Sequence, residues 1–248
     1  MRTVLVVQAH PDDEVFATGA ATAVLSDAGW HVVLRVATQG MGDAADKLQA
    51  SCDLLGIDEW DWLSTQERWV DDGGRSGPRT LASAELGEVS SAVERVLSDV
   101  SPQLLLTVGR DGLTGHPDHI AISQAVQLSL RQQPCHALGA RLRTQDVQAG
   151  HQHLQQLLPG EQVGSGLLTG CTTPLQEITG TPEIAVRRRK ALDQYYDGLG
   201  TTDIPELVTT YGRRGDSLLL RAVFDASGWD TDRFEVLSSS GSDAPSFP

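Results

Sequence analysis

The sequence predicts an α/β fold with a mostly parallel sheet covered by helices on both faces. Apolar runs typical of buried strands alternate with segments whose small and apolar residues recur at helical spacing. Polar loops follow two of the predicted strands, and open parallel sheets bind ligands beyond the carboxyl ends of their strands. The length of 248 residues suits one large domain. We therefore expect a single domain over residues 1–237.

The first half of the chain is predicted to form repeated strand and helix units. Residues 3–7 are a continuous apolar run rich in β-branched side chains, which predicts a strand buried on both faces. Residues 15–28 show helical spacing, and Gly29 is a natural helix end. The same criteria predict strands at 31–38, 59–63 and 104–108, and helices at 43–55, 81–100 and 117 to about 130.

The second half has a less regular pattern. A Gln-rich stretch suggests only a weak helix at 146–157, and apolar runs predict strands at 163–169 and 217–224. A helix is expected from Thr181-Pro182 to Tyr196, because proline is favoured in the first turn. Residues 238–248 are rich in Ser, Gly and Pro and are expected to be disordered.

Charge and composition limit the class of partner. The formal net charge of −14 argues against nucleic acid, which is bound by clustered Lys and Arg, and favours a small-molecule substrate. The one basic run, residues 187–190, is interpreted as a solvated helix face. No signal peptide or membrane span is recognised, and the three cysteines form no CxxC pair. We expect a cytoplasmic protein without a membrane partner, and homo-oligomerisation stays open.

The first polar loop places His10, Asp12, Asp13 and Glu14 at the end of a buried strand. Carboxylates so close together repel one another, and a bound cation would relieve that repulsion. An imidazole three residues before a carboxylate suits a divalent metal ion. The purely structural alternative is an Asp-rich helix N-cap, in which the carboxylates accept backbone N–H bonds.

The second polar loop, residues 109–118, repeats the His-Pro-Asp element of the first loop after another strand. Pro117 is expected to begin the next helix, with His119 one turn inside, so that His116 and His119 can face one crevice. Two such elements, each between a strand and a helix, favour a shared metal site over two separate helix caps.

Two His and one Asp would leave metal positions open, as in catalytic rather than structural sites. The metal would lower the pKa of a bound water, a free carboxylate could take its proton, and a further His could stabilise an oxyanion or protonate the leaving amine. Two alternatives stay open. A facial triad of this composition also occurs in non-haem iron oxygenases, and the chain could be a metal- or sugar-binding module without turnover.

Ala-His-Pro-Asp-Asp-Glu at residues 9–14 and His-Pro-Asp-His at 116–119 closely resemble the LmbE-like (PIG-L) family of zinc-dependent N-acetylglucosaminyl deacetylases. The resemblance covers about the first 130 residues and implies a Rossmann-like sheet. It implies Zn²⁺, with Fe²⁺ or another divalent ion as alternatives, and hydrolysis of an N-acetyl or other N-acyl group on an amino sugar or sugar-containing metabolite. The implied zinc ligands are His10, Asp13 and His119. Asp12 would be the general base, and His116 would stabilise the oxyanion or act as acid. Asp118 would contact a ligand rather than the metal and orient a histidine.

Some positions depart from the family pattern. Residues 44–47, Ala-Ala-Asp-Lys, replace an Arg and Glu that hold the sugar in the family, and Tyr195 and Tyr196 replace a His-containing element near the end of a late helix. The segment 132–173, where substrate loops are expected, is divergent. Further candidate substrate contacts are Arg68, Asp71, Asp72 and Arg110.

Overall fold

The computed structural model describes residues 1–75 and 77–239 of the chain, and a seven-stranded sheet forms the centre of this part. The strand order is β3-β2-β1-β4-β5-β7-β6. The four strand pairs among β1 to β5 are parallel, whereas β7 is antiparallel to both β5 and β6. The strands are β1 (Thr3–Gln8), β2 (His31–Val36), β3 (Glu59–Trp62), β4 (Leu104–Val108), β5 (His136–Ala140), β6 (Gln176–Thr179) and β7 (Thr231–Ser238). The predicted α/β class with a mostly parallel sheet is confirmed.

The helices of the described residues connect these strands and form a small additional group. They are α1 (Asp13–Phe16), α2 (Gly19–Asp27), α3 (Ala44–Leu55), the 3-10 helix η1 (Leu81–Ser83), α4 (Leu86–Val100), α5 (Gly112–Gly115), α6 (Pro117–Ser129), α7 (Thr144–Leu157), α8 (Pro182–Tyr195), α9 (Ile204–Thr209) and α10 (Asp216–Ser227). Among them, none combines the length and the apolar composition that crossing a bilayer requires.

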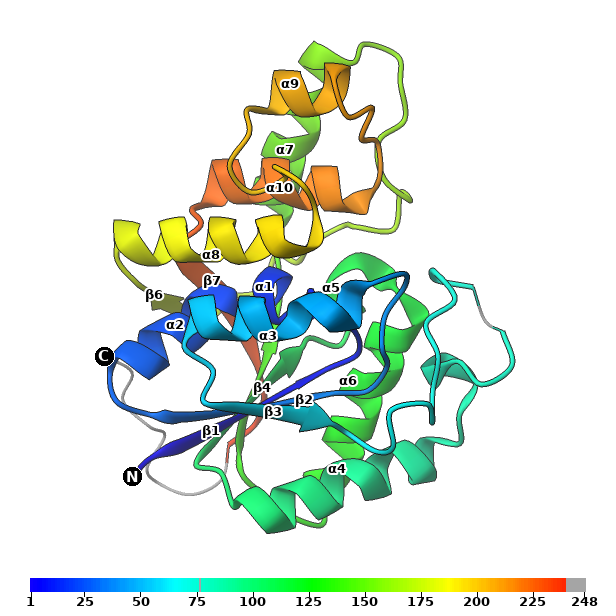
Figure 1. The fold of residues 1–248 in the computed structure, drawn as a ribbon, viewed down its shortest axis with the longest axis vertical. Coiled ribbons are helices and arrows are strands. Elements are labelled where there is room, and N and C mark those ends of the chain that lie inside the picture. The colour runs from blue at the N-terminus through cyan, green and yellow to red at the C-terminus, as the bar shows by residue number, and fades with distance from the viewer. Residues whose placement is uncertain (76, 240–248) are drawn as a thin grey trace.

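The helices lie on both faces of the sheet (Figure 1). Helices α2, α3 and α8 pack together on one face, and α4 and α6 pack on the other. Helices α7, α9 and α10 lie farther from the sheet, at the top of Figure 1, with α7 packed against α10. Helix α8 lies between this helical group and the sheet layer, so its carboxyl end is next to both.

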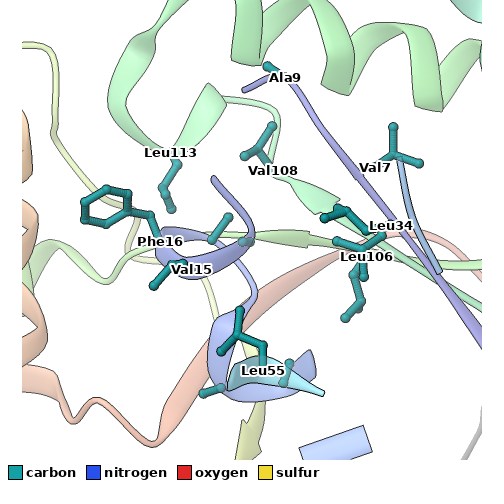
Figure 2. Close-up of a cluster of buried hydrophobic side chains, with 14 of the residues drawn as sticks. Val7, Ala9, Val15, Phe16, Leu34, Leu55, Leu106, Val108 and Leu113 are labelled. Atoms are coloured by element: carbon teal, nitrogen blue, oxygen red, sulfur yellow. The ribbon is translucent and has the colours of Figure 1, made fainter. Parts of the chain in front are cut away.

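Buried apolar side chains join the central strands to the helices. Figure 2 shows Leu34 and Leu106, from strands β2 and β4, next to each other, with Leu55 of α3 in the same cluster, and all three are fully buried. Two side chains of the same cluster, Phe16 and Leu113, come from the short helices that follow β1 and β4. The two polar loops are thus attached to the core by apolar residues directly next to them, which keeps the loop backbones fixed.

Four predicted elements differ from the structure. The run at 217–224 lies in helix α10, not in a strand, because apolar residues buried on several sides of a helix lack a distinctive period. Residues 163–169 form no strand, and Gly164 and Gly166 adopt φ angles of 77° and 81° that interrupt extended backbone. The helices predicted at 15–28 and 81–100 are each divided in two, as α1 with α2 and η1 with α4.

The remaining corrections concern the later part of the chain. Strands β5, β6 and β7 and helix α9 were not predicted. Strand β7 extends to Ser238, one residue beyond the predicted domain limit of 237, and Ser239 follows it. The rest of the segment 238–248 that was expected to be disordered lies outside the described residues, from residue 240 onward.

Candidate metal centre

The two His-Pro-Asp loops meet at one edge of the sheet. Strands β1 and β4 are parallel neighbours, so their carboxyl ends place His10 and the segment 109–119 side by side. Pro117 is the first residue of α6 and His119 lies in its first turn, as predicted. Residues separated by more than 100 positions in the chain therefore share one crevice.

The ring nitrogens of His10 and His119 face each other together with the carboxylate of Asp13. The Nδ1 atom of His10 lies 3.1 Å from Nε2 of His119. The two oxygens of Asp13 complete the group, with Oδ1 3.1 Å from Nε2 of His119 and Oδ2 3.5 Å from Nδ1 of His10. All three side chains are buried.

The other nitrogen of each histidine ring is already engaged. Nε2 of His10 lies 3.2 Å from Oδ2 of Asp118, and Nδ1 of His119 lies 3.0 Å from the carbonyl oxygen of Gly112. Carbonyl and carboxylate oxygens only accept hydrogen bonds, so these nitrogens carry the protons of the neutral rings. The nitrogens that face each other then present lone pairs.

Two ring nitrogens and a carboxylate whose lone pairs are directed at one region repel one another unless a cation lies among them. Ligands held about 2.0–2.2 Å from a tetrahedral zinc ion lie roughly 3.3–3.6 Å from each other. The two ring nitrogens are 3.1 Å apart, and each lies near a different oxygen of Asp13, Nε2 of His119 at 3.1 Å from Oδ1 and Nδ1 of His10 at 3.5 Å from Oδ2, which is close to that geometry. The donor set of two imidazoles and one carboxylate therefore fits a divalent metal such as Zn²⁺.

Electrostatics in the site point the same way. Burial would raise the pKa of Asp13, but the imidazoles of His119 and His10 hold it well below its usual range. Burial would lower the pKa of His10, but the carboxylates of Asp118 and Asp13 raise it above its ordinary value. The cluster favours an anionic Asp13 and a positive charge next to it, the role that a metal ion fills.

His116 lies beside the two histidines that face each other. Its ring centroid is 4.8 Å from that of His10 and 4.7 Å from that of His119, and ligand atoms of the three rings lie within 4.8 Å of one another. The backbone N–H of Asp118 donates to Nδ1 of His116 at 3.2 Å, so the proton of the neutral ring is on Nε2. Burial, followed by the neighbouring His119 and His10, lowers the pKa of His116 to about 4.

Asp12 and Glu14, the other carboxylates of the first loop, have different surroundings. Asp12 has a φ angle of 101°, an unusual value for a residue other than glycine, and such strain persists only where neighbouring contacts enforce it. Glu14 supplies one of these contacts, because its Oε2 accepts the N–H of Asp12 at 2.9 Å. Oε1 of Glu14 accepts hydrogen bonds from Ser51 and Tyr195. Glu14, which was given no role as a ligand, thus holds the backbone of the loop.

A cavity of about 430 Å³ opens onto these residues. Its walls come from the ends of several elements: the loops after β1, β2, β3 and β4, the amino ends of α3 and α10, and the carboxyl end of α8. The cavity is lined by the three facing residues His10, Asp13 and His119, and by Asp12, His116, Lys47, Asp71, Tyr195, Tyr196 and Asp216. It is large enough for a sugar-sized ligand.

The other candidate contacts are divided between the cavity and the surface. Asp71 lines the cavity, and its Oδ1 lies 3.8 Å from Nε2 of His10. Arg68, Asp72 and Arg110 instead form ion pairs, with Glu88, Arg75 and Glu235 respectively. Of these four candidate substrate contacts, Asp71 is therefore the one that faces the cavity.

The interpretation of residues 187–190 as a solvated helix face is wrong for Arg188, which is fully buried. Its guanidinium donates to the carbonyl oxygens of Val15 and Phe16, each at 2.8 Å, and pairs with Asp232 at 2.9 Å. A buried arginine of α8 thus satisfies backbone groups of the turn that follows the first loop.

Part of the chain matches a known protein family. The family model for PIG-L, GlcNAc-PI de-N-acetylase, matches residues 5–129. That segment is half of the chain and contains both His-Pro-Asp loops. The protein therefore belongs to the PIG-L family, as its motifs predicted.

A relative in Thermobispora bispora, a 1D-myo-inositol 2-acetamido-2-deoxy-alpha-D-glucopyranoside deacetylase, is 35% identical over 145 residues, which cover 48% of this chain and 48% of the relative. This chain thus spans about half the length of the curated relatives it matches. Among solved structures, a deacetylase from teicoplanin biosynthesis has a TM-score of 0.63 at 15% identity, covering 98% of this chain and 100% of the other. The 4-carboxy-2-hydroxymuconate hydratase GalB of Pseudomonas putida has a TM-score of 0.55 at 12% identity, covering 99% and 100%. The fold is therefore shared by enzymes with different reactions.

Proposed function

We propose that this protein is a zinc-dependent hydrolase that removes an N-acetyl or other N-acyl group from an amino sugar or a sugar-containing metabolite. The observation that carries the proposal is the convergence of His10, His119 and Asp13 within 3.1–3.5 Å, with the other ring nitrogen of each histidine next to an acceptor, Asp118 or the carbonyl of Gly112. Membership of the PIG-L family supports deacetylation over other reactions of the fold, and so does the Thermobispora bispora relative, which is named a deacetylase.

In this proposal His10, Asp13 and His119 hold the metal. Asp118 orients His10 from behind, because its Oδ2 atom accepts from Nε2 of that ring. A zinc ion held there supplies a Lewis acid that polarises the amide carbonyl and lowers the pKa of water. The identity of the ion as Zn²⁺ rather than Fe²⁺ is part of the proposal.

Asp12 is proposed as the general base. It lines the cavity next to Asp13, and one of its carboxylate oxygens, Oδ1, takes no hydrogen bond from a described residue. Burial, followed by the adjacent charge of Asp13, raises the pKa of Asp12. Oδ1 would accept the proton of the attacking water and return it to the leaving nitrogen, so that the C–N bond breaks to give a carboxylate and an amine.

His116 is proposed to stabilise the oxyanion. The N–H of Asp118 occupies its Nδ1 atom, so Nε2 carries the proton and can donate a hydrogen bond into the cavity. A proton on Nδ1 of His116 would break the hydrogen bond from the N–H of Asp118 and would make two N–H groups face each other. A neutral donor is therefore favoured over an imidazolium acid, which supports oxyanion stabilisation as the proposed role.

The substrate is proposed to be a small molecule, and the protein is proposed to act in the cytoplasm without a nucleic-acid or membrane partner. The wall of the cavity contains Asp43, Asp71 and Asp216, whereas Lys47, which also lines it, is paired with Asp43 at 2.9 Å. Acidic walls disfavour phosphorylated sugars and suit neutral or amine-bearing ones.

The proposal is tested by measuring amine release from a panel of N-acylated amino sugars. The panel includes 1D-myo-inositol 2-acetamido-2-deoxy-alpha-D-glucopyranoside, the substrate that names the relatives. We expect release that a chelator abolishes and added Zn²⁺ restores. Turnover that requires oxygen would instead select the oxygenase alternative. Tight sugar binding with zinc present and no amine release would select the binding module.

A further inference from the structure

The carboxyl end of helix α8 contacts the proposed general base directly. The hydroxyl of Tyr196, the residue after α8, donates a hydrogen bond to Oδ2 of Asp12 at 2.5 Å, and 184 positions separate the two residues. Tyr196 lies outside the segment 5–129 that the family model matches. The contact therefore brings a residue from beyond the matched segment into the centre of the site.

Packing fixes the position of the Tyr196 ring. Its centroid lies 6.1 Å from that of Phe16, at a tilt of 56°, and the guanidinium carbon of Arg213 lies 5.6 Å from the ring centroid. Arg213 also donates to the carbonyl oxygen of Asp197, next to Tyr196 in the chain. Contacts on several sides leave the hydroxyl little freedom to move away from Asp12.

The neighbouring Tyr195 holds the same loop through a different residue. Its hydroxyl donates to Oε1 of Glu14 at 2.7 Å, and Oε2 of Glu14 accepts the N–H of Asp12 at 2.9 Å. The backbone of Asp12 is thus fixed through Tyr195 and Glu14, and its side chain is fixed through Tyr196. The two tyrosines act on different parts of one residue.

No other hydrogen bond from a described side chain or backbone group reaches the carboxylate of Asp12. Rotation about the last side-chain bond of aspartate has broad energy minima, so an untethered carboxylate samples many orientations. The charge of Asp12, followed by burial, raises the pKa of Tyr196 above its ordinary range, so its hydroxyl stays protonated and remains a donor.

We propose that Tyr196 is a positioning residue for the reaction, which holds Oδ2 of Asp12 so that Oδ1 stays directed at the attacking water. This inference rests on the proposed function for the role of Asp12. Tyr196 also lines the cavity, and a residue that mainly bound substrate there would change KM rather than kcat. The two roles can thus be separated by kinetics.

The kinetic test is Tyr196→Phe, which removes the hydroxyl and keeps the ring. A hydrogen bond to a charged group contributes about 1.5–3 kcal/mol, so we expect kcat to fall roughly 10- to 100-fold, with KM changed less than about two-fold. Zinc content and melting temperature should equal those of the wild type. The matched control is Tyr211→Phe on an exposed tyrosine, which should leave both constants unchanged. Unchanged kcat in Tyr196→Phe, or a rise in KM alone, would overturn the inference.

A second measurement does not depend on activity. Crystal structures of the zinc-loaded wild type and of Tyr196→Phe, grown under the same conditions, compare the Asp12 carboxylate. We expect a single orientation in the wild type, and a rotated carboxylate or several orientations in the variant. An unchanged carboxylate in the variant would overturn the inference whatever the kinetics. A displaced carboxylate in an enzyme that deacylates no member of the panel would support the tether and reject the proposed function.

Discussion

Oδ2 of Asp118 lies 3.2 Å from Nε2 of His10, although 108 positions separate the two residues. The other oxygen of Asp118, Oδ1, accepts the backbone N–H of Ala82 at 2.7 Å. Burial would raise the pKa of Asp118, but the hydrogen bonds from His10 and Ala82 lower it, so the residue is an anion. Each oxygen thus has a fixed donor, and the carboxylate determines which nitrogen of His10 carries the proton.

Asp118→Asn is therefore expected to weaken zinc binding. The single oxygen of asparagine would be taken by the N–H of Ala82, and its NH₂ group would face Nε2 of His10. His10 would then carry its proton on Nδ1, the atom that faces His119 and Asp13. We expect the Kd for zinc to rise about 10- to 100-fold, measured by competition with a chromophoric chelator.

Asp99→Asn is the control, because Asp99 lies exposed on α4. It should bind zinc as the wild type does. An Asp118→Asn variant with the wild-type Kd would show that the carboxylate does not set the tautomer of His10.

The adjacent residues Asp12 and Asp13 should behave differently when truncated. Asp12→Ala removes the proposed base without removing a proposed ligand, so kcat should fall about 10²- to 10⁴-fold with zinc retained. Asp13→Ala removes an oxygen that lies 3.1 Å from Nε2 of His119, so zinc should be lost with the activity. Metal analysis of both purified variants, together with amine release, checks this. Full activity of Asp12→Ala, or its loss of zinc, would contradict the assigned roles.

Strands β1, β2 and β4 could be predicted because each contains an apolar run and is followed by a polar loop. Strand β5 (His136–Ala140) was missed because a histidine and a glycine interrupt that signal, although it is fully buried in the sheet. Edge strand β6 (Gln176–Thr179) buries only Ile178, so it has hardly any apolar pattern. Helix α10 resembled a strand because its run Leu218 to Phe224 is buried without interruption.

The residues of the candidate site that lie within the two His-Pro-Asp motifs could be predicted from the sequence. His10, Asp13 and His119 could be named because each belongs to a short motif at the junction of a predicted strand and a predicted helix. Tyr196, the partner of Asp12, differs from the family pattern, but nothing in its own sequence neighbourhood relates it to a residue 184 positions away. The same limit applies to Arg188, whose burial depends on carbonyl groups of Val15 and Phe16.

Arg188→Met tests the structural role of this arginine. Arg188 and Asp232 are both buried, and removing the cation leaves the anion without its partner. Loss of one member of a buried pair costs about 3–5 kcal/mol of unfolding free energy, to be measured by urea denaturation. Arg187→Met is the matched control, because Arg187 pairs with the exposed Asp27, and such pairs contribute about 0–1 kcal/mol. Equal stability of the two variants would exclude a buried anchor at Arg188.

Acid sensitivity is expected from Asp225, which accepts hydrogen bonds from Arg221 at 3.0 Å and from Arg189 and Trp229 at 2.8 Å. Burial would raise its pKa, but Arg221 and Trp229, followed by the charge of Arg189, lower it in the folded state. The unfolded pKa is about 3.9, so the carboxylate stabilises the fold above that pH, and the contribution is lost as the pH falls through the lower folded value. Asp225→Asn should therefore be less stable than the wild type by about 1–3 kcal/mol between pH 5 and 8, and the difference should shrink below about pH 4 in urea denaturation.

Asp53→Asn, which changes an exposed carboxylate bonded to Gln49, should show no such pH-dependent difference. A difference for Asp225→Asn that grows toward acid pH would mean that the folded pKa is raised rather than lowered.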